Sequence, residues 1–173
     1  MVSRSNEHEI GTMKTMKYID RYIEFFYEKF GPSVHECPAP EKLIGEYMGK
    51  VPETLISYWK EYGWCGYNNG IFWTVNPDKY KRVVSEWLSD TPFESKDNYH
   101  LIGLGAFGEM ILWGEETGNS LTITPSHGMI FYTDKSEFIA KNEDGYNTLI
   151  KSLFSSMKKW APQGISKMFL LML

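Results

Sequence analysis

Apolar residues recur at helical spacing in four long stretches of the chain, and a fifth stretch is compatible with a short helical turn. The predicted helices cover Met16–Phe30, about 52–62, Pro77 to about Leu88, and a closing segment with apolar residues from Leu149 to Trp160, while the short turn lies around Glu41–Tyr47. Capping residues support these limits. Pro52 suits a first helical turn, Gly63 suits a left-handed helix stop, and Asn76-Pro77 suits an N-cap followed by a first-turn proline. Asp144 or Asn147 is expected to cap the closing helix.

Short runs of aromatic and β-branched residues predict the strands. They are Ile71–Val75, Tyr99–Leu104, Phe107–Trp113, Leu121–Thr124 and Met129–Tyr132. Between them, Gly66–Gly70 and Glu115–Asn119 are typical of turns, whereas Ser33–Pro40 and Asp134–Asp144 are expected to be loops.

Helices first, then a meander of strands, then a closing helix is the pattern of an α+β domain. We therefore predict one antiparallel β-sheet packed with N-terminal and C-terminal helices. Residues 1–13 are expected to be a loose N-terminus, and residues 14–173 to form a single domain. Trp59, Trp73 and Trp87 each lie on the apolar side of a predicted element, so we expect all three to anchor the core.

The run YWKEYGWCGYNNGIFWTVNP, from Tyr58 to Pro77, resembles the GAD-like domain family of bacterial proteins. A second block, YHLIGLGAFGEMILWG at Tyr99–Gly114, is similar to that family's glycine-aromatic strand pair, and the resemblance extends from about Tyr47 to about Trp160. It implies structural roles for the motif residues, which are Trp59, Gly63, Trp64, Gly66, Gly70, Trp73, Pro77, Gly105, Phe107 and Gly108.

Several members of that family are immunity proteins that neutralise DNase toxins delivered by type VI secretion. The resemblance therefore implies a cognate toxin as partner and carries no catalytic chemistry. An immunity protein of the SMI1/KNR4-like superfamily is the alternative within the same class, because its proline-led helix before a glycine turn and strand is similar to Pro52–Val75. Family members continue past the closing helix with an aromatic-proline segment that ends in paired glycines. This chain ends in APQGISKMFLLML, so we expect a truncated or altered C-terminal end.

Composition and charge narrow the range of possible functions. A formal net charge of −4 and 23% charged residues argue against direct nucleic-acid binding, which usually requires a basic surface. The N-terminus has no apolar signal segment and the apolar C-terminal tail is too short to span a bilayer, so we expect a cytoplasmic protein, favoured as a monomer, without membrane contact. Cys37 and Cys65 are too few to form a disulfide framework and are expected to be free thiols.

Catalytic chemistry lacks support in the pattern of residues. Gly103–Gly108 satisfies G-x-G-x-x-G, but a strand follows it where a dinucleotide site needs a helix N-terminus. The four histidines show no metal-ligand spacing, and no nucleophile elbow occurs. We expect no catalytic residues, no cofactor and no metal. A small cytosolic enzyme or a ligand-binding domain remains the alternative from another class, and a polar pocket with converging titratable groups would favour it.

Carboxylates surround the predicted hairpin that ends near residue 124. Glu109 lies inside its first strand, Glu115 and Glu116 follow that strand, and Asp134 lies on a later loop. One interpretation is a solvated sheet edge that opposes aggregation. The other is an acidic surface that meets the basic DNA-binding cleft of a nuclease and occludes it. We assign these four residues to the toxin-binding surface.

Overall fold

The computed structural model describes residues 18–157 of the chain. The expected loose N-terminus and the expected alteration of the C-terminal end both lie outside the described residues, as does Trp160. Six helices occur within the described part: α1 (Arg21–Phe30), α2 (Glu41–Tyr47), α3 (Glu53–Tyr62), α4 (Lys81–Leu88), α5 (Ser136–Lys141) and α6 (Gly145–Ser156). Two single 3₁₀ turns, Pro77–Tyr80 and Pro125–His127, join neighbouring elements.

The strands form one seven-stranded sheet in which every neighbouring pair is antiparallel and the spatial order equals the chain order. Their bounds are β1 (Val34–Cys37), β2 (Trp64–Tyr67), β3 (Phe72–Thr74), β4 (Tyr99–Gly105), β5 (Met110–Gly114), β6 (Gly118–Thr124) and β7 (Met129–Tyr132). The predicted α+β class with an antiparallel sheet is therefore confirmed.

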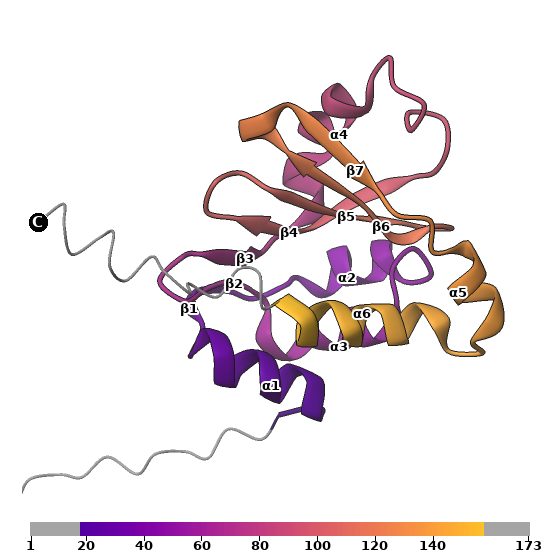
Figure 1. Ribbon diagram of the computed structural model, residues 1–173. Helices are drawn as coiled ribbons and strands as arrows, with labels where there is room; N and C mark the ends of the chain where they lie inside the picture. The colour runs from indigo at the N-terminus through magenta and orange to yellow at the C-terminus, as the bar shows by residue number, and fades with distance from the viewer. Residues whose placement is uncertain (1–17, 158–173) are drawn as a thin grey trace, which may run out of the picture.

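The two faces of the sheet carry separate cores, because successive side chains of a strand point to opposite faces. On β5, Ile111 and Trp113 join the larger core with α1, α2, α3 and α6, whereas Met110 and Leu112 join a smaller core with Val84 and other residues around α4. Figure 1 shows α1, α3 and α6 on one side of the sheet and α4 on the other.

The structure differs from the sequence-based prediction at three elements. Ser33–Pro40 contains strand β1, in which Val34 pairs with Gly66 and Cys37 with Trp64. The predicted turn Gly66–Gly70 begins two residues later, because Gly66 and Tyr67 still belong to β2. The predicted loop Asp134–Asp144 contains the short helix α5.

Candidate functional site

Three of the four assigned carboxylates lie at the same edge of the sheet. Glu115 and Glu116 follow the end of β5, and Asp134 follows the end of β7 by two residues. Since β5 and β7 are both antiparallel to β6, their carboxyl ends meet at one edge. Glu109 precedes β5 and therefore lies at the opposite edge, where its main-chain oxygen accepts a hydrogen bond from Gly105 N at 2.8 Å.

Glu115 is held in place by a histidine. Its Oε1 lies 2.8 Å from His100 Nε2, and the side chains are 27% and 11% exposed, respectively. The His100 ring meets the Tyr47 ring edge-on with centroids 5.2 Å apart. This contact joins the sheet edge to the helical layer.

The contact with Tyr47 continues into an ion pair. Tyr47 donates its hydroxyl hydrogen to Asp78 Oδ1 at 2.7 Å, and Asp78 also pairs with Lys81. The hydrogen bond from Lys81, followed by that from Tyr47, lowers the pKa of Asp78, while burial raises the pKa of Tyr47. The result is a continuous chain of contacts from Glu115 to Lys81, in which the step between His100 and Tyr47 is a ring contact.

Asp97 organises the turn that carries Glu116. Its Oδ2 accepts hydrogen bonds from Thr117 N at 2.8 Å, from Thr117 Oγ1 at 2.7 Å and from Glu116 N at 3.0 Å. These bonds fix the backbone between β5 and β6, and the Glu116 side chain is exposed. Asp134 is exposed as well, and hydrogen bonds from Ser136 lower its pKa.

A hollow of about 470 Å³ lies beside this edge, between α4 and the start of β4. Its acidic and basic lining residues are Lys50, Lys81, Glu94, Asp97, His100 and Glu115. Both lysines have partners, since Lys81 pairs with Asp78 and Lys50 lies 5.8 Å from the centre of the Tyr47 ring. Within residues 18–157, by contrast, no lysine or arginine pairs with the three carboxylates of the lining.

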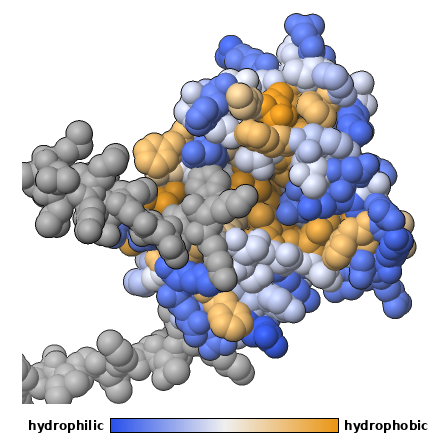
Figure 2. Space-filling view, in the orientation of Figure 1, coloured by the Kyte–Doolittle hydropathy of each residue, from blue (hydrophilic) through white to orange (hydrophobic). Residues whose placement is uncertain are grey.

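A larger hollow of about 620 Å³ lies between α6 and strands β5 to β7. Ile111, Phe131 and Leu153 line it, and Figure 2 shows apolar surface between the sheet and α6. Because Met157, the last described residue, also belongs to its lining, we assign no site there.

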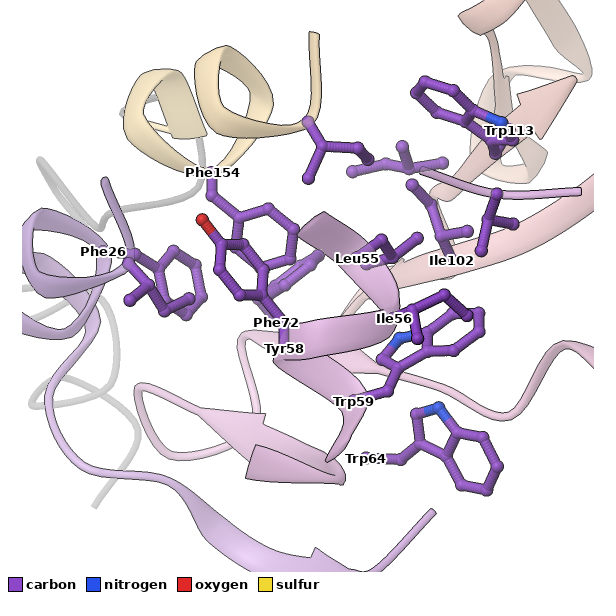
Figure 3. Packing of buried hydrophobic residues seen from close by; sticks show 14 of the residues in the cluster. Phe26, Leu55, Ile56, Tyr58, Trp59, Trp64, Phe72, Ile102, Trp113 and Phe154 are labelled. Carbon is purple, nitrogen blue, oxygen red and sulfur yellow. The ribbon is translucent and has the colours of Figure 1, made fainter. Parts of the chain in front are cut away.

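The family-motif residues of the helix-turn-strand block mostly hold the fold together. Trp59 is 1% exposed and lies against Trp64 with ring centroids 6.0 Å apart (Figure 3). Gly63 ends α3 with φ +68°, and a Cβ there would lie 2.5 Å from the main-chain oxygen of Cys37. At Gly66 a Cβ would meet the ring of Trp73 at 2.9 Å, so these two glycines permit close approaches that a larger residue would block.

The remaining motif residues lie in turns or in the strand ends beside them. The Trp73 indole donates to Gly70 O at 2.9 Å, and Pro77 is buried in the first turn after Asn76, whose side chain accepts from Asp78 N. In the β4–β5 turn, Gly108 N donates to Gly105 O at 3.0 Å, and Gly108 adopts φ +85°. Phe107, which the resemblance assigned a structural role, is instead 65% exposed at the tip of that turn.

The glycine motif Gly103–Gly108 spans the end of β4 and the turn before β5. A strand follows it, as the sequence predicted, and there is no helix N-terminus to hold a pyrophosphate. Among residues 18–157, no group of three or more His, Cys, Asp or Glu side chains is arranged to hold a metal ion. In the same range no helix is long and apolar enough to cross a membrane.

Cys37 is exposed, Cys65 is buried, and both are free thiols as expected.

The fold is an α+β domain with a seven-stranded antiparallel meander between two helical layers, and comparisons with known proteins agree with this architecture. The family model of the GAD-like domain matches residues 21–127, more than half of the chain, so the chain belongs to the GAD-like domain family. This match starts before Tyr47, at α1, and ends at His127, ahead of the closing helix.

The fold is similar to that in the crystal structure of Atu4351 from Agrobacterium tumefaciens, with a TM-score of 0.65 and 22% sequence identity. The alignment covers 78% of this chain and 60% of that one, so this chain spans less than two thirds of its length. No curated protein matches the chain.

Glu115 and Glu116 could be predicted from the sequence, but the groups around them could not all be predicted from local pattern. Lys50, Lys81 and Glu94 come from three segments whose meeting depends on the tertiary fold. His100 and Asp97 could have been found from the hairpin register, since Tyr99 pairs with Gly114 and this places both residues beside the β5–β6 turn.

Proposed function

We propose that the protein is an immunity protein that binds and inhibits a cognate bacterial toxin, a DNase effector of type VI secretion, in the cytoplasm. Membership of the GAD-like domain family supports the class. The observation that carries the proposal is the gathering of Glu115, Glu116 and Asp134 at one sheet edge beside a hollow with unbalanced carboxylates.

Such an edge suits the inhibition of an enzyme that holds DNA. A nuclease binds the phosphate backbone through basic residues, and carboxylates on a preformed surface can occupy the same residues. Charge complementarity then raises the association rate, and occlusion of the cleft excludes the substrate. Glu109 lies at the opposite edge of the sheet and is not part of this surface.

The test is co-expression with the nuclease encoded beside this gene, followed by scoring of cell viability and chromosome integrity. We expect survival only when the intact protein is present. The variant Glu115→Lys/Glu116→Lys should protect poorly, and its residual binding should be less sensitive to salt, because salt screens attractive charge pairs. Death of cells that express the intact protein, with no complex detected between the two purified proteins, would rule the proposal out.

A ligand-binding domain is the second candidate, and the hollow with its converging titratable groups favours it. A thermal-shift screen with charged metabolites separates the two functions. A saturable shift that Glu115→Gln removes, together with failure to bind the neighbouring nuclease, would favour the ligand-binding domain.

A further inference from the structure

The carboxylates of the hollow are held by internal hydrogen bonds that leave one oxygen of each glutamate available. Glu94 Oε2 accepts from Asp90 N at 3.0 Å, and Glu115 Oε1 is bound by His100. Within the described part of the chain, Glu94 Oε1 and Glu115 Oε2 make no hydrogen bond. Two anchored carboxylates, each with a free oxygen, therefore line the same hollow and can both act as acceptors.

The charge balance indicates which kind of side chain this pair would accept. Lys81 is paired with Asp78, and Lys50 lies against the Tyr47 ring and lowers the pKa of Asp78. Lys81 is therefore compensated and Lys50 is engaged by an aromatic ring, whereas Glu94 and Glu115 have no cationic partner among the lysines and arginines of residues 18–157. An entering cation would donate charge-assisted hydrogen bonds to both glutamates.

The apolar part of the lining adds a shape argument. Val84, Leu88 and Tyr99 also line the hollow. An arginine packs its methylene stem and planar guanidinium against such surfaces, and its fixed fork of N–H groups can serve two carboxylates at once. A lysine ammonium is more strongly hydrated and has no comparable fork.

We propose that this hollow receives one arginine side chain of the toxin, with Glu94 Oε1 and Glu115 Oε2 as the acceptors. The proposal rests on the proposed function and identifies the contact that anchors it. Arginine is common where proteins contact DNA phosphates, so an inhibitor that captures one would compete directly with the substrate.

The experiment compares single and double glutamine variants by calorimetry with the neighbouring nuclease. Glu94→Gln and Glu115→Gln keep the shape of each side chain and remove its charge. We expect the double variant to lose about tenfold or more in affinity, mainly through faster dissociation. Glu28→Gln is the matched control, because it removes the same charge from an exposed position on α1, away from the hollow and from the carboxylates at the sheet edge, and it should change affinity by less than about threefold. Melting temperatures confirm that each variant is folded.

The outcomes separate this proposal from the proposed function. Wild-type binding that the double variant retains within about twofold would overturn the arginine pocket and leave the immunity function intact. A larger loss of affinity for Lys50→Gln or Lys81→Gln than for the glutamate variants would also overturn the arginine pocket, because it would show that the hollow receives an acidic side chain of the toxin instead. If the wild type does not bind the nuclease, the proposed function fails, and a titration with N-acetylarginine amide followed by NMR decides the pocket alone. Saturable shifts at His100 and Tyr99 that the double variant loses would support it, and unchanged spectra would overturn it.

Discussion

At the scale of single residues, the three tryptophans expected to anchor the core differ in burial. Trp59 is 1% exposed, and its ring meets those of Tyr47 and Trp64. Trp73 and Trp87 are half-buried and pack against the smaller core from its side. The expectation is correct for Trp59 and too strong for the other two. For Trp87 the reason is that the apolar stripe of α4 is wider than the sheet surface it covers, since Val83 on the same helix is 42% exposed.

This difference predicts unequal costs of truncation. Trp59→Ala should lower the free energy of unfolding by about 3–5 kcal/mol, since the surrounding core cannot close over the lost ring. Trp87→Ala leaves a gap that opens to solvent and should cost less than about half as much. Urea unfolding of both variants measures the difference. Equal losses would show that Trp87 carries as much of the core as Trp59.

At the scale of elements, local signals correctly predicted α3, β3 and the start of the segment at Pro77. Each depends on residues adjacent in sequence, such as the Asn76 cap, whose Oδ1 accepts from Asp78 N at 2.9 Å. Of the two residues expected to cap the closing helix, Asp144 is correct in position only. Asp144 precedes α6 without a capping hydrogen bond from its side chain, and Asn147 instead accepts from Thr54 N.

The missed elements depend on distant partners. Strand β1 pairs with β2 about thirty residues later, and its polar sequence VHEC has no apolar alternation to reveal it. Helix α5 packs against α6 although no residue of α5 is buried, so it lacks the apolar stripe that identifies a helix.

The β5–β6 turn makes a prediction at this scale. Asp97→Ala removes the acceptor for both Glu116 N and Thr117 N and should speed hydrogen exchange at these two amides by about tenfold or more. Asp97→Asn retains one carbonyl acceptor and is the matched control, with a smaller effect expected. Hydrogen exchange followed by NMR is the measurement. Unchanged exchange in Asp97→Ala would mean that the turn holds its shape without this side chain.

At the scale of the whole molecule, the part of the site that could be predicted follows from the sheet. In a meander, alternate strands end at the same edge, so Glu115, Glu116 and Asp134 come together once the strand order is known. The hollow could not be predicted in the same way. It requires α4 to cross the sheet and the loop bearing Lys50 to reach β4, and both placements depend on tertiary packing.

The larger core also contains several buried tyrosines, and these predict an alkaline limit to stability. Burial raises the pKa of Tyr27 to about 12, and it is also the main reason that the pKa values of Tyr58 and Tyr67 are raised. An unfolded tyrosine releases its proton near pH 10, so above that pH the unfolded state binds fewer protons than the folded state. The stabilisation is therefore complete below about pH 10 and is lost as the pH rises towards and beyond 12.

We expect the folded structure, followed by circular dichroism, to be lost between about pH 10 and 12, together with a rise in tyrosinate absorbance. Tyr27→Phe cannot ionise at this position and should move the midpoint to higher pH, provided that its neutral-pH stability stays close to that of the wild type. Tyr22→Phe, at a position 36% exposed, is the matched control and should leave the midpoint unchanged. A complete rise in tyrosinate absorbance while the circular dichroism stays constant would show that these phenols ionise within the folded core, against the burial on which the prediction depends.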